Sequence, residues 1–159
     1  MTDGSGVFAD LARSPLYRFA DWPNGQVPRF GAGAYTIWHN DERFIYAGMS
    51  GRSIKADTTA SNRAYGLYTR LHSHASGRRS GDQFCVYVAD RLVLPTLAAG
   101  DITLIASGRH KFDALVRRYI HEHLGYRFIV LPDGVAAYNL ERQIRSGAWG
   151  CGVPLLNPL

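Results

Sequence analysis

The sequence predicts one α/β (α+β) domain in which helices flank a small, mainly antiparallel sheet of three to four strands. Three observations predict this class. The chain has 159 residues, which is a usual length for a single domain. Two runs rich in β-branched and aromatic residues, 33–39 and 43–49, are separated by a short polar turn, as is typical of a β-hairpin. Later segments repeat apolar residues at helical spacing.

The first predicted element is an N-terminal arm, and the hairpin follows it. Residues 1–30 carry three prolines between aromatic residues, so we expect an irregular segment that packs on the core. If Asn40 and Asp41 form the turn of the hairpin, Tyr35 lies directly opposite Tyr46, and both rings project from one face of the sheet.

Helices and strands follow the hairpin. Residues 48–62 are a polar loop, and the helix expected over 63–76 has Leu67 and Leu71 in its apolar stripe. The other expected elements are a third strand over 83–89, a short helical turn and a short strand within 91–108, a helix over 111–124 stopped by Gly125, a fourth strand over 126–131 and a last helix over 134–145.

The charge balance favours a polyanionic partner. The formal net charge is +5, and 16 of the 18 cationic residues are Arg, whose planar guanidinium group matches phosphate oxygens. A genome rich in G and C gives the same preference for Arg, so charge by itself does not identify the partner.

No segment indicates a membrane, an export route or a zinc site. The longest apolar run, 92–99, is interrupted by Pro95 and is far shorter than the roughly 20 residues of a membrane helix. Residues 1–6 lack the features of a signal peptide, so we expect a cytoplasmic protein without membrane contacts. The spacing of Cys85 and Cys151 fits neither a metal site nor a disulfide framework.

Two short motifs in the predicted hairpin share a pattern. Gly33-Ala34-Tyr35 opens the first strand, and Tyr46-Ala47-Gly48 closes the second. They resemble the two halves of the signature of the GIY-YIG nuclease superfamily, with Ala in place of Ile in each half. The residues that this family carries downstream follow in the same order: Arg70 and His74 one turn apart on a helix, Glu141 in the last helix, and Asn157 after Pro154.

The resemblance implies a metal-dependent endonuclease that hydrolyses phosphodiester bonds in DNA. It implies a nuclease domain over 31–159, preceded by the arm and carrying an insertion around 91–131. The family serves as restriction enzymes and as standalone structure-dependent nucleases, and the sequence does not choose between them. The resemblance also implies the catalytic residues, which are Tyr35, Tyr46, Arg70, His74, Glu141 and Asn157.

The chemistry of these residue types suits phosphodiester hydrolysis. Mg²⁺ (or Mn²⁺) often takes only one or two carboxylates, so Glu141 alone can serve as the metal ligand. Arg70 offers a guanidinium fork to the phosphate as charge accumulates in the transition state. The resemblance makes Tyr35 the base, with His74 taking or orienting its proton, while Tyr46 orients water or phosphate. A phenol needs nearby positive charge to act as a base, which Arg70 and the metal would supply, and which tyrosine is the base stays open.

Other basic residues are candidates for contacts with DNA phosphates, because loop and helix-surface cations position a duplex without reading its sequence. They are Arg52, Lys55, Arg63, Arg78 and Arg79. The oligomeric state stays open, a homodimer included.

Every candidate also has a purely structural interpretation. Tyr35 and Tyr46 can be an ordinary aromatic pair, and Glu141 with Arg145 four residues later can be a surface ion pair. A non-catalytic nucleic-acid-binding module on the same fold is therefore one alternative function, and an RNA-directed nuclease is another.

Overall fold

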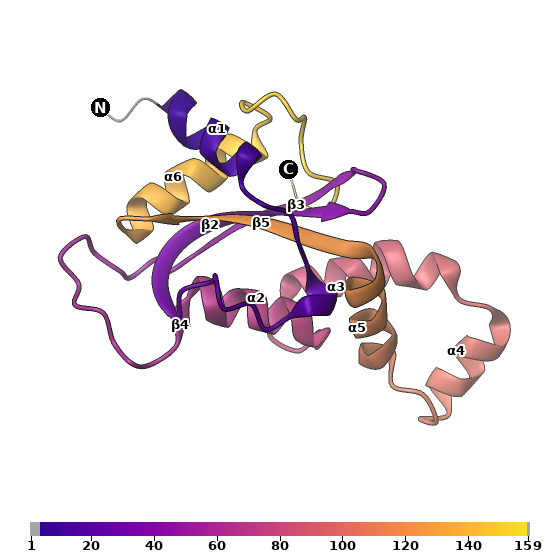
Figure 1. Ribbon diagram of the computed structural model, residues 1–159. Helices are drawn as coiled ribbons and strands as arrows, with labels where there is room; N and C mark the ends of the chain where they lie inside the picture. The colour runs from indigo at the N-terminus through magenta and orange to yellow at the C-terminus, as the bar shows by residue number, and fades with distance from the viewer. Residues whose placement is uncertain (1–3, 159) are drawn as a thin grey trace.

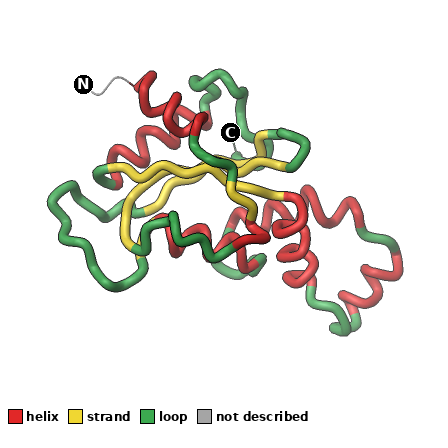
Figure 2. The backbone as a smooth tube through the Cα atoms, in the orientation of Figure 1, coloured by secondary structure: helices red, strands yellow, loops and turns green. Residues whose placement is uncertain are grey.

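The computed structural model describes residues 4–158 and has the predicted class, with helices on both faces of a mainly antiparallel sheet (Figures 1 and 2). The sheet has five strands in the order β1-β5-β2-β3, and β4 pairs in parallel with the start of β2. Two of the strands contain only two residues each, which periodicity cannot detect. The bounds are β1 Tyr17–Arg18, β2 Phe30–His39, β3 Phe44–Ser50, β4 Tyr65–Gly66 and β5 Leu124–Leu131.

The helices form two layers around the sheet. Helices α1 (Gly4–Arg13) and α6 (Gly134–Arg145) cover one face, and α2 (Leu67–Ser76), α3 (Gln83–Val88) and α5 (Phe112–His123) cover the other (Figure 1). Each layer has its own apolar cluster, because alternate residues of β2 face opposite sides. Helix α4 (Ala99–Ala106) projects from the side of the molecule (Figure 1).

The hairpin is present, but its register differs from the expected one. Tyr35 pairs with Gly48, and Tyr46 pairs with Ile37. The turn is longer than two residues, with Glu42 in the left-handed region at φ 67°, and a bulge follows it. The shift amounts to two residues, which keeps a side chain on the same face of a strand. The predicted pairing was therefore wrong, while both tyrosines still lie on the face that α2 covers.

The N-terminal arm packs on the core as expected, but it is not irregular. Helix α1 packs on β5 and buries Leu11 in the apolar cluster on the α6 face of the sheet, and β1 extends the sheet by pairing with β5. A short 3₁₀ turn, Phe19–Asp21, then buries Phe19 in the opposite layer. The three prolines stand outside these elements, so they punctuate the arm without preventing local order.

The strand expected over 83–89 is a helix, α3. Its β-branched and aromatic residues favour a strand locally, yet buried Phe84, Cys85, Val88 and Ala89 recur at helical spacing. Asp82 caps the helix by accepting a hydrogen bond from the Cys85 N–H at 3.2 Å. Tertiary packing has overridden propensity here. The strand expected within 91–108 is also absent from this described segment, which forms a π-helical turn (Ala89–Val93), a 3₁₀ turn (Leu94–Thr96) and α4.

The later elements agree more closely with the prediction. Helix α6 has the expected bounds, and α5 differs by one residue at each end. Gly125 lies inside β5 rather than stopping α5, and α2 begins at Leu67 rather than at residue 63. Strand β5 pairs along most of β2, so the segment 91–131 supplies a central strand of the sheet.

None of the helices formed by residues 4–158 has the length and apolar character that crossing a membrane requires.

Candidate active site

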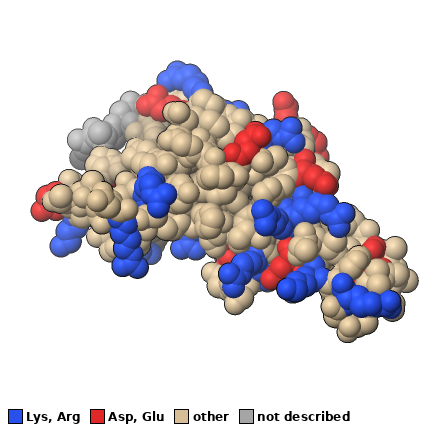
Figure 3. All heavy atoms as spheres, turned by 60° about the horizontal axis from the view of Figure 1, so that its bottom comes forward, with Lys and Arg blue, Asp and Glu red and all other residues tan. Residues whose placement is uncertain are grey.

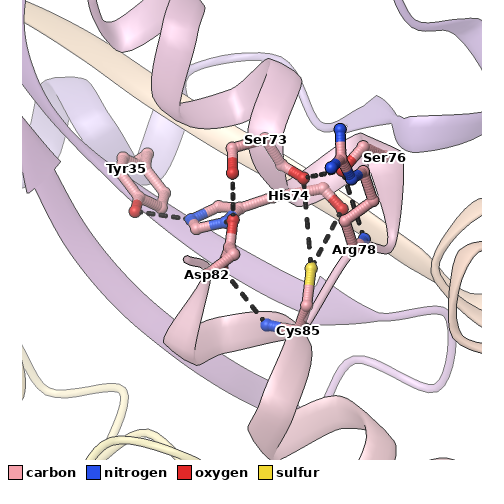
Figure 4. Close-up of polar contacts among 7 residues, drawn as sticks. All are labelled: Tyr35, Ser73, His74, Ser76, Arg78, Asp82 and Cys85. Carbon is pink, nitrogen blue, oxygen red and sulfur yellow. Dashed lines mark hydrogen bonds and ion pairs between the residues drawn. The ribbon is translucent and has the colours of Figure 1, made fainter. Parts of the chain in front are cut away.

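Three buried side chains form a hydrogen-bonded chain on the α2 face of the sheet (Figure 4). The Tyr35 hydroxyl lies 2.7 Å from His74 Nε2, and His74 Nδ1 lies 2.7 Å from Asp82 Oδ2. Tyr35 comes from β2, His74 from α2 and Asp82 from the turn before α3. We call Tyr35, His74 and Asp82 the buried relay. Its order, a hydroxyl, an imidazole and a carboxylate, is that of an activated nucleophile or base.

Burial and hydrogen bonding set the charges of this relay. Burial raises the pKa of Asp82, but hydrogen bonds from His74, Ser73 and the Cys85 N–H outweigh it and lower the pKa to about 2. Burial lowers the pKa of His74 below 6.5, although Asp82 acts in the opposite direction. At neutral pH the relay therefore holds an ionised carboxylate and a neutral imidazole.

Tyr35 is not made acidic by its surroundings, contrary to our expectation. Burial raises its pKa well above 10, the neighbouring Tyr46 adds to this, and Arg70 opposes it only in part. The side chain is 1% exposed, so desolvation of a phenolate is the dominant cost. Tyr35 is thus a neutral phenol whose proton can leave only through a hydrogen-bonded partner, and that partner is His74.

Tyr46 packs beside Tyr35 and His74, on the side of the buried relay that is nearer to solvent. Its ring centroid is 6.5 Å from that of Tyr35 and 6.1 Å from that of His74, and it also packs on Phe84. The side chain is only partly buried, and burial raises its pKa to about 12. The structure therefore brings Tyr35 and Tyr46 to one imidazole, with Tyr46 nearer to solvent.

Two glycines of the hairpin, Gly33 and Gly48, allow this close packing. A Cβ on Gly48 would lie 2.3 Å from the Tyr35 hydroxyl, so any side chain there would displace the ring. A Cβ on Gly33 would lie 2.2 Å from the carbonyl oxygen of Ile129 and 2.5 Å from the Leu67 side chain. Strand β5 and helix α2 can therefore lie this close to β2 only because residue 33 has no side chain.

Arg70 stands beside the relay and does not touch it. It is exposed on α2 and lines a cavity of about 370 Å³ together with Arg52, Thr69 and Ser73. The Ser73 hydroxyl donates to Asp82 at 2.6 Å, so this cavity lies directly next to the relay. The guanidinium group of Arg70 suits a phosphate, whose oxygens accept such donors, while that of Arg52 lies over the ring of Tyr138.

Glu141 is buried, although a surface ion pair was the expected alternative. It is 8% exposed, its carboxylate lies 3.2 Å from Arg145, and it lines a cavity of about 490 Å³ between α6 and the C-terminal segment. It makes no hydrogen bond to the relay within the described chain, and its charge raises the pKa of Tyr46 after the larger effects of burial and Asp82.

The donor set fits only a weakly held divalent ion. Within residues 4–158 no three His, Cys, Asp or Glu side chains come together at one point. A single carboxylate on an open cavity suits Mg²⁺ only when water and substrate oxygens complete its coordination. Glu141 would thus supply the one carboxylate of such an ion, at a cavity that shares no lining residue with the cavity beside Arg70.

Asn157 holds the backbone of β3. Its side-chain oxygen accepts from the Ala47 N–H at 2.7 Å, and its side-chain nitrogen donates to the Ala47 carbonyl at 2.9 Å. The backbone N–H groups of Leu155 and Leu156 also donate to β3. Asn157 therefore fixes the residue next to Tyr46, and these two bonds use its side-chain oxygen and one of the two N–H donors of its amide.

The candidate DNA contacts are spread over the surface, and two are already engaged. Arg79 pairs with Asp113 at 2.6 Å and lies over the ring of Phe112, and Arg52 lies over Tyr138. The other three, Lys55, Arg63 and Arg78, are exposed. Figure 3 shows basic side chains across the face that α2 and α5 cover, with acidic ones among them.

Sequence reasoning missed Asp82. An Asp directly after Gly81 and before an apolar run is a typical N-cap, and that signal was obscured by the strand predicted for 83–89. Its link to His74 crosses from one element to another, so spacing alone does not reveal it.

Comparison with known protein families, curated proteins and solved structures finds no match to this chain.

Proposed function

We propose that the protein is a divalent-metal-dependent endonuclease that hydrolyses phosphodiester bonds in DNA, as the resemblance to GIY-YIG nucleases implies. The observation that supports it most is the hydrogen bond from Tyr35 to His74, because it gives a neutral phenol a base to which its proton can pass. Tyr35, Tyr46 and Gly48 of the hairpin meet His74 of α2 on one face of the sheet.

The residues would divide the work as follows. Tyr35 takes a proton from the attacking water while its own proton passes to His74 Nε2. Arg70 binds the phosphate at the neighbouring cavity and stabilises the charge of the transition state. Tyr46, which is closer to solvent, orients the water. Glu141 would hold Mg²⁺ or Mn²⁺, which polarises the phosphate when bound.

Specificity is not encoded in these residues. The basic residues at the surface suit phosphate contacts, which position a duplex without reading its bases. Binding should then weaken steeply with salt, since each phosphate contact releases counterions. We favour DNA, and an RNA substrate is an outcome of the test below.

The experiment is incubation of supercoiled plasmid with the purified protein in Mg²⁺ or in EDTA. We expect nicking or cutting in Mg²⁺ only. His74→Gln should lower the rate by about 10²-fold or more, because it removes the proton acceptor. His72→Gln is the matched control, since His72 lies on the same helix, is exposed and contacts Trp22 instead of the relay.

Three results would contradict the proposal. Equal cleavage by the His74 and His72 variants would show that the activity does not use the relay. DNA binding without cleavage in any divalent metal would favour the non-catalytic module. Cleavage of an RNA duplex or strand but not of plasmid would favour the RNA-directed nuclease.

A further inference from the structure

We propose that Asp82 is a positioning residue whose carboxylate holds His74 in the one tautomer that can take the proton of Tyr35. The inference rests on the proposed function for its catalytic consequence, but the tautomer is a property of the folded protein. Asp82 is outside the residues that the family resemblance names.

The hydrogen-bond geometry determines the tautomer. An ionised carboxylate only accepts hydrogen bonds, so His74 Nδ1, 2.7 Å from Asp82 Oδ2, must carry the ring proton. A neutral imidazole has one N–H, which leaves Nε2 as an acceptor for the Tyr35 hydroxyl at 2.7 Å. In the other tautomer Nε2 would carry a proton and could not accept one from Tyr35.

The carboxylate itself is fixed by further donors. Oδ2 also accepts from Ser73 at 2.6 Å, and Oδ1 accepts from the Cys85 N–H at 3.2 Å, where it caps α3 (Figure 4). Asp82 is 2% exposed and cannot rotate to solvent without losing all three partners. Each oxygen therefore has an assigned role, one toward the helix and one toward the imidazole.

This division of roles predicts the effect of Asp82→Asn. The helix cap needs an oxygen, and Asn caps as well as Asp. With its oxygen toward Cys85, Asn places its NH₂ group where Oδ2 stood. That donor faces His74 Nδ1, which must then be unprotonated, and the proton moves to Nε2.

The other groups around His74 do not impose this choice. Tyr35 and Tyr46 approach from the sheet, Arg70 lies on the same helix, and the Cys85 thiol contacts the His74 carbonyl oxygen at 3.6 Å. None of the four contacts Nδ1. Among the described residues, only Asp82 forms a hydrogen bond with that nitrogen.

The first test reads the imidazole directly, by ¹⁵N NMR of histidine-labelled protein at neutral pH. Protonated and unprotonated ring nitrogens have well-separated shifts. We expect wild-type His74 to carry its proton on Nδ1, and the Asp82→Asn protein to carry it on Nε2. Asp82→Ser, which keeps a cap but is too short to reach the imidazole, should populate both tautomers. An Nε2–H wild type, or an unchanged pattern in Asp82→Asn, would refute the proposal.

The second test is single-turnover cleavage between pH 6 and 9. Asp82→Asn should reduce the rate by about 10²-fold or more. Raising the pH should not restore the rate, because a neutral imidazole keeps its proton on Nε2 and cannot accept the proton of Tyr35 there. Asp113→Asn, which removes one acidic charge without touching His74, should keep the wild-type profile. Wild-type cleavage by Asp82→Asn would overturn the role of Asp82. A wild type that cleaves nothing yet shows the Nδ1–H tautomer would refute the nuclease function and leave the positioning role confirmed.

Discussion

Replacing Gly48 by Ala tests the close packing on which the relay depends. The new Cβ would lie 2.3 Å from the Tyr35 hydroxyl and 2.4 Å from Cζ, where ordinary contact begins near 3.4 Å, so the ring must withdraw by about 1 Å. Such overpacking costs about 1 to 3 kcal/mol. A ring that withdraws also weakens the buried bond to His74, which costs about 1 to 3 kcal/mol more if it is lost.

We therefore expect Gly48→Ala to lower the free energy of unfolding by about 2 to 6 kcal/mol, a large share of a typical 5 to 15 kcal/mol. Urea denaturation measures this, and cleavage should fall with it. Gly25→Ala is the control, because a Cβ there has no atom within 4 Å, and it should stay within about 1 kcal/mol of the wild type. If Gly48→Ala were as stable as the control, the Tyr35 ring would not be held where the structure has it.

Three further predictions concern charge. Arg70→Lys should slow cleavage by at least about tenfold with little loss of affinity, because a point donor cannot bridge two phosphate oxygens. Arg13→Lys is the control, since Arg13 is exposed on α1 and pairs with Asp10, and equal rates for the two variants would exclude Arg70 from the transition state. Glu141→Gln should abolish Mg²⁺-dependent nicking and leave DNA binding intact. The control is Glu122→Gln, at an exposed residue, and normal nicking by the Glu141→Gln protein would exclude Glu141 as the metal ligand. In the folded protein the pKa of His74 lies below 6.5 and that of Asp82 below 3.8, so as the pH falls the unfolded chain takes up these protons first. The free energy of unfolding should therefore decrease below about pH 6.5, because of His74, and again between pH 3.8 and about 2, because of Asp82. The second fall is about 2 kcal/mol for Asp82, and urea titrations should show it missing from Asp82→Asn.

The hairpin and the last helix could be predicted because their signals are local. Runs rich in β-branched and aromatic residues on either side of a polar turn allow few other structures. Residues 134–145 combine a helical stripe with the N-cap Asp133. The register could not be predicted, since it depends on the left-handed Glu42 and on a bulge, neither of which leaves a pattern of side chains. The prediction that Tyr35 and Tyr46 lie on the same face of the sheet is correct only because the register differs from the expected one by an even number of residues.

The candidate site was partly predictable for the same reason. The resemblance supplied Tyr35, Tyr46, Arg70 and His74, and the structure brings them around one imidazole and its neighbouring cavity. It did not supply the burial of Glu141 or the contact of His74 with Asp82, because both depend on how separate elements pack. Local propensity even pointed away from Asp82, by favouring a strand where α3 forms.

The hydrogen bonds of Asn157 with Ala47 also affect when this site can form during folding. The two residues are 110 positions apart, so the contact closes a loop of most of the chain. Contacts of such long range form later than local ones, since the entropy of closing the loop is lost before the contact stabilises anything. A partly folded chain can thus contain the hairpin and α2 while β3 lacks its final partners. The finished arrangement around Tyr46 is then a property of fully folded molecules alone.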